Sequence, residues 1–211
     1  MSVLLLTATI LEQARLAAEL TDSVRVVACG RTWHHGQCAG REVDLIESGL
    51  GAVNTAHALT RALEARQPEM VLQIGVAGAY ANSGLQIGDL AVAEEDVHGD
   101  LGVVTPSGWY AADEIGIPVV QLGDRSLFNR YPADDELGRR ATEILRRRGT
   151  VRVERGVFVT VQACSGSSAL GAERQSRVPG ALCENMEGAA AAQVCALYGV
   201  RFVELRGISN A

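Results

Sequence analysis

Residues 182–211, LCENMEGAAAAQVCALYGVRFVELRGISNA, contain a polar loop, a helical run and a strand in close succession. The small residues of Ala189–Tyr198 predict a helix, and Gly199 stands where a helix C-terminus favours a residue that tolerates a positive φ. The apolar residues of Val200–Leu205 predict a buried strand. This succession predicts an α/β fold, in which ligands bind beyond the carboxyl ends of the strands.

Two groups of polar side chains flank this helix and strand. One group precedes the helix and the other follows the strand; the members are Glu184, Asn185 and Glu187, and then Arg206, Ser209 and Asn210. Taken singly, each residue has an ordinary structural explanation, because the helix dipole alone favours a glutamate in the first turn by roughly 0.3–1 kcal/mol. Taken together, the two groups are directed at one crevice, and we interpret them as a candidate ligand site.

The composition is that of a globular protein of one domain. With 211 residues, 47% of them hydrophobic, and 23 glycines, the chain can bury a sizeable core as a single α/β unit. The net charge of −6 argues against nucleic acid as a partner, because nucleic-acid binding needs a basic face. All 19 basic residues are arginine, which excludes a Schiff-base lysine and a P-loop lysine.

The cysteines and the apolar segments bear on the cellular compartment. The five cysteines are an odd number without a paired short spacing, which favours a reduced cytoplasmic protein over a disulfide framework or a zinc site. The apolar segment Val3–Leu6 is too short for a signal peptide, and no run approaches the length of a membrane span. We therefore expect a cytoplasmic protein that has no membrane partner.

The rest of the chain alternates strands and helices. The expected strands are Val3–Leu6, Val24–Ala28, Glu42–Glu47, Met70–Ile74, Leu90–Ala93, Val151–Val153 and Val157–Val161. The expected helices are a first one ending near Leu20, followed by Ala52–Arg66, Asp134–Arg148 and Ser168–Arg177. Trp33–His35 is expected in a surface loop. Its two adjacent histidines point to opposite sides of an extended segment, and such pairs rarely bind one metal. Glu94–Pro132 is the least regular segment, and its lone His98 is expected to be solvated.

Several of these segments resemble one enzyme family. The sequences NMEGAAAA at 185–192 and RGISN at 206–210 resemble the nucleoside phosphorylase and nucleosidase superfamily, whose members cleave the N-glycosidic bond of nucleosides. The resemblance continues in GLGAVN at 49–54 and in the glycine-rich turn at 75–78, so it covers most of the chain. It implies a three-layer α/β/α fold with a central twisted mixed sheet, formed by one nucleosidase domain over residues 1–211. The family continues with one more helix, which shields the base site; this sequence ends before it.

The resemblance also implies roles for individual residues. In nucleosidases of this family, a glutamate at the distance of Glu12 from the first strand activates the attacking water as a general base. Glu187 is then expected to bind the ribose hydroxyls, Met186 to pack against the sugar, Arg206 to orient Glu12, and Asn210 to bind the departing base. The remaining predicted substrate contacts are Asn185, Gly78, Val76, Ser165 and Ser209. No metal and no organic cofactor is implied.

Two positions favour water over phosphate as the nucleophile. Phosphorylases of the family carry an arginine and a serine near the turn at 75–78, where this chain has Gln73 and Val76. A phosphate dianion needs charge-assisted donors, and neither of these side chains supplies one. We therefore expect hydrolysis, which passes through an oxocarbenium-like ribosyl cation by analogy with glycoside hydrolysis.

The predicted leaving base is hypoxanthine. A 6-oxopurine protonated at N7 presents one donor and one acceptor, and the amide of Asn210 is complementary to this pair. Adenine-specific relatives have an aspartate at the position of Asn210 and an aromatic residue near Cys164 and Ser165. Within the superfamily the chain looks most like the futalosine hydrolases, so the expected reaction releases hypoxanthine and dehypoxanthine futalosine in menaquinone biosynthesis.

Three other functions stay open at this point. An adenine-releasing methylthioadenosine/S-adenosylhomocysteine nucleosidase is disfavoured by Asn210, and a 6-oxopurine nucleoside phosphorylase is disfavoured by Gln73 and Val76. A nucleoside-binding protein without activity is disfavoured by the joint presence of Glu12 and Glu187. The apolar and aromatic segment Trp109–Tyr131 predicts a homodimer or a higher homo-oligomer, because large exposed apolar patches mark interfaces.

Overall fold

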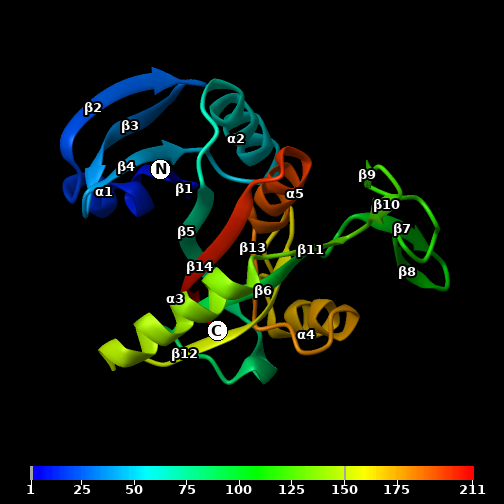
Figure 1. Cartoon of the computed structure of the whole chain (residues 1–211). Coiled ribbons are helices and arrows are strands. Elements are labelled where there is room, and N and C mark those ends of the chain that lie inside the picture. The colour runs from blue at the N-terminus through cyan, green and yellow to red at the C-terminus, as the bar shows by residue number, and fades with distance from the viewer. Residues whose placement is uncertain (1, 150) are drawn as a thin grey trace.

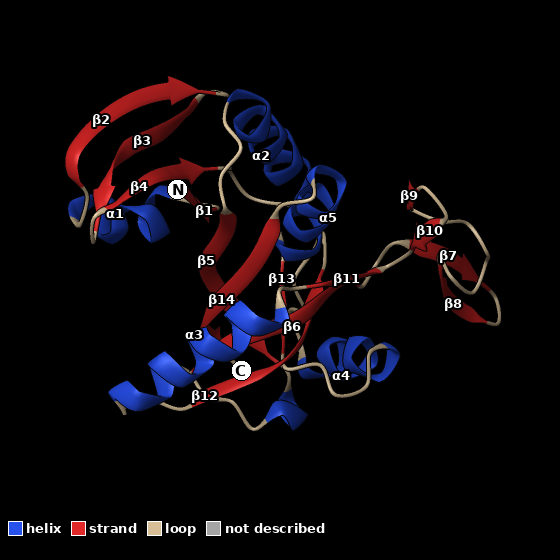
Figure 2. Ribbon diagram, in the orientation of Figure 1, coloured by secondary structure: helices blue, strands red, loops and turns tan. Residues whose placement is uncertain are grey.

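A mixed ten-stranded sheet forms the centre of the computed structural model, which describes residues 2–149 and 151–211 (Figure 2). Its strands are β1 (Ser2–Thr7), β2 (Thr21–Ala28), β3 (Arg31–Cys38), β4 (Arg41–Glu47), β5 (Met70–Ala79), β6 (Leu90–His98), β11 (Arg130–Pro132), β12 (Val153–Thr160), β13 (Cys183–Asn185) and β14 (Arg201–Asn210). They are ordered β11-β6-β12-β13-β5-β1-β4-β3-β2, and β14 pairs with both β5 and β6. The predicted central mixed sheet is confirmed.

Helices cover both sides of this sheet. They are α1 (Ile10–Ala18), α2 (Ala52–Ala65), α3 (Asp135–Arg148), α4 (Ser168–Arg177) and α5 (Gly188–Tyr198). Figure 1 shows α2 and α5 side by side on one side of the strands, with α3 and α4 on the other. The predicted α/β/α layering is therefore present. Within the described residues, no helix combines the length and the apolar character needed to cross a membrane.

Strand β14 is longer than its apolar run predicts and closes part of the sheet on itself. It pairs parallel with β5 from Arg201, opposite Met70, to Asn210, opposite Gly78, with one register shift between Ile208 and Asn210. Its other edge pairs antiparallel with β6, and β6, β12, β13 and β5 pair in turn. These five strands form a closed ring, so residues 206–210 are strand rather than the loop expected after Leu205.

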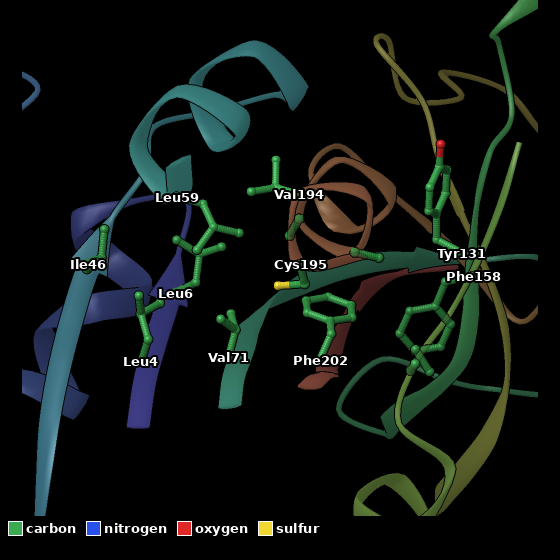
Figure 3. Close-up of a cluster of buried hydrophobic side chains, with 14 of the residues drawn as sticks. Leu4, Leu6, Ile46, Leu59, Val71, Tyr131, Phe158, Val194, Cys195 and Phe202 are labelled. Carbon is green, nitrogen blue, oxygen red and sulfur yellow. The ribbon is translucent and has the colours of Figure 1, made fainter. Parts of the chain in front are cut away.

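The core lies between the sheet and the helix pair α2 and α5. Figure 3 shows Leu4, Leu6 and Val71 from the strands meeting Leu59 of α2 and Val194 of α5. Residues 189–192, all alanine, are buried, which lets α5 approach the sheet closely as their small size predicts. The start of α5, which carries Glu187, is thereby fixed against the strands.

The segment Trp33–His35 lies in strand β3 and not in a loop. Two hairpin turns that the sequence did not indicate explain the difference. Cys29 and Gly30 have φ of 54° and 70°, and Ala39 and Gly40 have φ of 49° and 75°. Two successive residues with positive φ make the turn type that matches the twist of paired strands, although Asn-Gly is its usual signature.

The segment 94–132 is more regular than expected. Strand β6 continues to His98, and β7 (Gly102–Thr105), β8 (Gly108–Ala111), β9 (Val120–Leu122) and β10 (Arg125–Leu127) form two small hairpins. Figure 1 shows these hairpins at one end of the molecule, beyond β11, and we call residues 102–127 the β7–β10 extension. Strand β9 contacts α5, and Val120 and Leu127 of the extension belong to the buried core. His98 is buried rather than solvated, and burial lowers the pKa of its imidazole.

One strand, β12, replaces the two strands expected at 151–153 and 157–161. Its pairing with β6 shifts register between Gly156 and Val157, which marks a local irregularity inside a continuous strand. Gly156 lies between the two expected segments, and a glycine inside a strand weakens the strand pattern of the sequence. Thr150, just before this strand, lies outside the described residues.

Candidate active site

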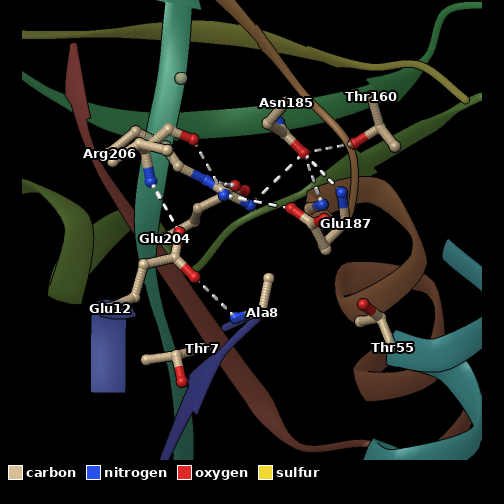
Figure 4. A network of polar contacts seen from close by, with 12 residues as sticks. Thr7, Ala8, Glu12, Thr55, Thr160, Asn185, Glu187, Glu204 and Arg206 are labelled. Atoms are coloured by element: carbon tan, nitrogen blue, oxygen red, sulfur yellow. Dashed lines mark hydrogen bonds and ion pairs between the residues drawn. The ribbon is translucent and has the colours of Figure 1, made fainter. Parts of the chain in front are cut away.

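Helix α1 and three consecutive elements near the end of the chain bring their polar residues together at one place. Figure 4 shows Glu12, Asn185, Glu187, Glu204 and Arg206 in one network of contacts. Glu12 comes from the start of α1, and Glu204 and Arg206 come from β14. Asn185 ends β13, and Glu187 caps the start of α5. The two polar groups that the sequence placed at one crevice therefore meet.

The carboxylate of Glu12 is held by two elements at once. One oxygen, Oε2, accepts hydrogen bonds from the backbone N–H of Ala8 at 3.0 Å and of Thr9 at 2.9 Å, which forms the capping box of α1. The other, Oε1, accepts a hydrogen bond from the N–H of Val76 on β5 at 3.1 Å. The helix cap therefore fixes the side chain, while the second oxygen lies at the edge of β5.

Arg206 is the centre of the network and is only 1% exposed. Its Nε donates to Glu204 Oε1 at 2.8 Å, and its Nη1 donates to the carbonyl of Val76 at 3.2 Å and to Glu187 Oε2 at 3.3 Å. Burial alone would lower the pKa of Arg206, but the carboxylates of Glu204 and Glu187 outweigh it and raise this pKa above its usual range. Arg206 is thus a permanent buried cation.

Gly75 makes the close approach of Arg206 and Glu12 to β5 possible. A Cβ at this position would lie 2.5 Å from Arg206 Nη1 and 2.8 Å from Glu12 Oε1. Both charged groups therefore border the same glycine, and both bind the backbone of Val76, one at its N–H and the other at its carbonyl. This geometry agrees with the expected proximity of Arg206 to Glu12.

Glu187 is buried and held from two sides. Its Oε1 accepts a hydrogen bond from the N–H of Gly51 at 2.9 Å, and its Oε2 faces Arg206. Gly51 caps the N-terminus of α2 with a φ of 86°, so the positive end of the helix dipole also points at the carboxylate. Gly51 was outside the predicted site, although it belongs to the GLGAVN segment that resembles the family.

Asn185 supports the site from beneath. Its Oδ1 accepts hydrogen bonds from the N–H groups of Glu187 at 2.9 Å and Gly188 at 2.7 Å, and its Nδ2 donates to Asp96 Oδ2 at 2.6 Å. Both the oxygen and the nitrogen of the Asn185 amide therefore form hydrogen bonds within the protein. It orients the turn that carries Glu187, rather than facing a ligand as the sequence suggested.

A buried pair of carboxyl groups, Asp96 and Glu204, lies below Arg206. Asp96 is 1% exposed and Glu204 is 0% exposed, and a Cβ on Gly188 would lie 2.0 Å from Asp96 Oδ2 and 2.5 Å from both Glu204 oxygens. Burial, and then the charge of Glu204, raise the pKa of Asp96 well above its usual range. Asp96 is therefore harder to ionise than an exposed aspartate, while Glu204 pairs with Arg206. Neither was predicted, although a glutamate inside an apolar strand is a signal of such a group.

A second part of the site is a cavity of about 270 Å3 beside β5. Three predicted residues line it, namely Gly78, Ser165 and Asn210, together with Tyr80 and Glu184. Gly78 stands two positions after Val76 on the same strand, a distance of about 7 Å. The cavity is therefore next to the network around Glu12 and Arg206.

The remaining predicted residues are Ser209, Met186 and Val76. Ser209 donates through its hydroxyl to the carbonyl of Ala77 at 3.3 Å and to Asn210 Oδ1 at 3.0 Å, which orients the amide of Asn210. Met186 is half-buried in the turn before α5. The side chain of Val76 is exposed, and Gln73 is buried within the sheet. In the described part of the chain, no cluster of three His, Cys, Asp or Glu side chains is arranged to hold a metal ion.

Comparisons with known proteins agree with this architecture. A family model described as the phosphorylase superfamily matches residues 2–211. A 5′-methylthioadenosine/S-adenosylhomocysteine nucleosidase of Chromohalobacter salexigens is 33% identical over 94% of this chain and 80% of its own length. A futalosine hydrolase of Thermus thermophilus is 39% identical over 78% of this chain and 68% of its own length.

Solved structures show the same similarity in three dimensions. The crystal structure of the 5′-methylthioadenosine/S-adenosylhomocysteine nucleosidase of Neisseria meningitidis, in complex with methylthio-immucillin-A, has a TM-score of 0.86 and 27% sequence identity. The similarity covers 99% of this chain and 85% of the other. With a family model that spans nearly every residue and a closely matching fold, this chain belongs to the phosphorylase superfamily.

Proposed function

We propose that this protein is a cytoplasmic purine nucleosidase that hydrolyses the N-glycosidic bond of futalosine and releases hypoxanthine. The observation that carries the proposal is the convergence of Glu12, Glu187 and Arg206 at one end of β5, next to a cavity that Asn210 lines. This reaction needs three groups: a carboxylate that accepts a proton from water, a carboxylate that binds the sugar, and an amide that binds the base. The curated nucleosidases similar to this chain support the same reaction class.

The proposed reaction begins at Glu12. Its carboxylate takes a proton from a water molecule while the water oxygen forms a bond to C1′ of the ribose. The C1′–N9 bond breaks, its electron pair goes to the purine, and the purine takes up a proton from solvent at N7 as it leaves; Glu12 later returns its proton to solvent. Glu187 accepts hydrogen bonds from the ribose hydroxyls, and its negative charge stabilises the oxocarbenium-like transition state.

Arg206 keeps these two carboxylates in place rather than contacting the base. It binds Glu187 directly and shares the backbone of Val76 with Glu12. The cation also lowers the cost of holding two negative groups close to each other. We therefore assign Arg206 as a positioning residue of the proposed nucleosidase.

Two side chains support hydrolysis over phosphorolysis. Gln73 is buried in the sheet, and Val76 presents an exposed apolar side chain. Neither gives the charge-assisted hydrogen bonds that a phosphate dianion requires. Water needs only one acceptor for its proton, which Glu12 supplies. Water therefore suits this environment better than phosphate does as the nucleophile.

The second candidate is a methylthioadenosine/S-adenosylhomocysteine nucleosidase. The relative with that activity matches more of this chain than the futalosine hydrolase does, 94% against 78%. The amide of Asn210 favours a 6-oxopurine, because the amide can donate to O6 and accept from N7–H. The identity over the aligned part is higher with the futalosine hydrolase, 39% against 33%.

One experiment separates the candidates. Futalosine, inosine and methylthioadenosine are each incubated with the protein, with and without phosphate, and the released base is identified by chromatography. We expect hypoxanthine from futalosine at a rate that phosphate does not change. Release of adenine from methylthioadenosine alone would assign the second candidate, a requirement for phosphate would assign a phosphorylase, and no release from any substrate would argue against catalysis.

A further inference from the structure

Glu184 is a buried carboxylate in the base-side cavity that the proposed mechanism leaves without a role. Among the described residues that line this cavity, it is the only charged one. Arg174 pairs with it at 3.4 Å, and the hydroxyl of Tyr80 donates to it at 3.3 Å. Burial, and then the charge of Glu184, raise the pKa of Tyr80 above its usual range, so this hydroxyl stays a donor.

The sheet places Glu184 opposite Asn210 across a glycine. On one edge of β5, Glu184 pairs with Gly78, and on the other edge Asn210 pairs with the same Gly78. The pairing of β14 shifts between Ile208 and Asn210, and this irregularity brings Asn210 into register with Gly78. Because directly paired residues share a face of a sheet, both side chains enter one cavity, from strands about 10 Å apart.

Gly78 lets the amide of Asn210 lie directly over β5 at the cavity. A Cβ at this position would lie 2.7 Å from Asn210 Nδ2. The absence of a side chain at Gly78 therefore makes room for the Asn210 amide, so that this amide and the carboxylate of Glu184 both line the cavity. A flat heterocycle in the cavity would meet both groups along its edges.

Glu184 retains capacity to accept a hydrogen bond from such a ligand. In the described structure, its Oε1 accepts one hydrogen bond, from the N–H of Ser165 at 2.5 Å, and each carboxylate oxygen has two lone pairs. Its Oε2 accepts from the hydroxyl of Ser165 at 2.8 Å, from the hydroxyl of Tyr80 at 3.3 Å and from Arg174 at 3.4 Å. These contacts hold the carboxylate rigidly, as a recognition group requires.

We propose that Glu184 recognises the N1–H of a 6-oxopurine and so is a second specificity-determining residue beside Asn210. This inference rests on the proposed nucleosidase function. In a 6-oxopurine, the N1–H lies next to O6, so an amide at O6 and a carboxylate at N1 are complementary to adjacent atoms. In adenine, N1 carries a lone pair instead of a hydrogen, and a carboxylate there would oppose acceptor to acceptor.

The test compares futalosine with its 6-amino analogue, which has the same 5′ substituent. In Glu184→Gln, the charge is lost and the amide can donate to the N1 of adenine. We expect kcat/KM for futalosine to fall about tenfold or more, and kcat/KM for the 6-amino analogue to stay level or rise. An equal loss on both substrates, or no change in their ratio, would overturn the assignment.

The matched control is Tyr80→Phe, which removes a hydrogen bond to the same carboxylate and keeps the acceptor. It should preserve the ratio of kcat/KM between the two substrates, whatever it does to the rate. A shift of the ratio as large as in Glu184→Gln would mean that general disturbance of the cavity, and not the acceptor, determines the preference, and would also overturn the assignment.

The measurements on the wild-type protein distinguish a failure of this inference from a failure of the function on which it rests. A wild-type protein that hydrolyses neither substrate refutes the proposed nucleosidase function itself, whereas active wild type with an unchanged ratio in the variant refutes only the role of Glu184. Where Glu184→Gln does not fold, binding of hypoxanthine and of 1-methylhypoxanthine to the wild type is measured by calorimetry. Weaker binding of the methylated base supports the assignment, and equal binding contradicts it.

Discussion

At the scale of single residues, the two oxygens of Glu12 have separate tasks. Oε2 belongs to the capping box of α1, and Oε1 faces Val76. Glu12→Gln keeps a carbonyl oxygen for the cap but removes the base, so we expect kcat to fall by roughly 10²–10⁴-fold with the fold intact. The control is Glu19→Gln at the exposed end of the same helix, which should leave kcat unchanged. A kcat for Glu12→Gln within a few-fold of the wild type would limit this residue to capping.

Asn210 gives a second prediction, because one atom pair determines its preference. In Asn210→Asp, an oxygen replaces the amide donor that faces O6 of hypoxanthine. A buried mismatch of this kind costs about 1–3 kcal/mol, so kcat/KM for futalosine should fall roughly tenfold or more. The 6-amino analogue should gain, because its amino group can donate to the new carboxylate. Equal losses on both substrates would show that Asn210 does not recognise the 6-position.

The carboxyl pair below Arg206 predicts how stability depends on pH. Burial raises the pKa of Asp96 well above its ordinary 3.8, so the folded state binds a proton that the unfolded state releases. Stability from this group is complete below the ordinary pKa and is lost as pH rises toward the raised one. We expect the free energy of unfolding of the wild type, relative to Asp96→Asn, to decrease as the pH rises above about 4. Urea titrations at several pH values measure it, and a difference independent of pH would contradict it.

At the scale of elements, the turn into α5 depends on a glycine with no space beside it. A Cβ on Gly188 would lie 2.0 Å from Asp96 Oδ2 and 2.5 Å from Glu204. Gly188→Ala should therefore destabilise the fold by about 1–3 kcal/mol and displace the adjacent Glu187. Gly171→Ala, inside α4 and with no contact closer than 3.8 Å, is the matched control and should be neutral or stabilising by up to about 1 kcal/mol. Thermal unfolding of both variants is the measurement; equal shifts would contradict the argument.

The elements that the sequence predicted well are those whose local signals agree with one another. Helix α5 combines a small-residue run with Gly199, which has the expected positive φ of 65°. Strand β14 was predicted only to Leu205, because the polar residues after it have no local strand signal. Long-range pairing with β5 and β6 stabilises that extension, and pairing of this kind is absent from a local pattern.

The candidate site also contains residues that sequence motifs predict and residues that only long-range contacts bring into it. Family motifs predicted Glu12, Glu187, Arg206 and Asn210, and the structure brings the first three into one network, with Asn210 at the adjacent cavity. Asp96 was not predicted, because its partner Glu204 is more than a hundred positions away and no spacing rule joins them. Contacts that depend on the closed ring of strands cannot be recovered from the sequence around each residue.

At the scale of the whole molecule, the β7–β10 extension is the feature that one chain leaves unexplained. It lies at one end of the molecule in Figure 1, and although Val120 and Leu127 pack into the core, Val104 is 80% and Ile117 63% exposed. Small hairpins are marginally stable in water unless their apolar side chains are covered. We therefore infer that a second copy of the chain covers the extension, in a homodimer or a higher homo-oligomer.

This inference predicts that one charged substitution on the extension changes the assembly. In Val104→Asp, a charge would be buried in the proposed interface, so we expect multi-angle light scattering to show a shift toward single chains at micromolar concentration. Ile144→Asp is the matched control, because Ile144 is 48% exposed on α3, away from the extension in Figure 1, and should leave the mass unchanged. Circular dichroism of both variants checks that each stays folded. A wild type that scatters as a single chain at this concentration would refute the inference, since no partner copy would then cover Val104 and Ile117.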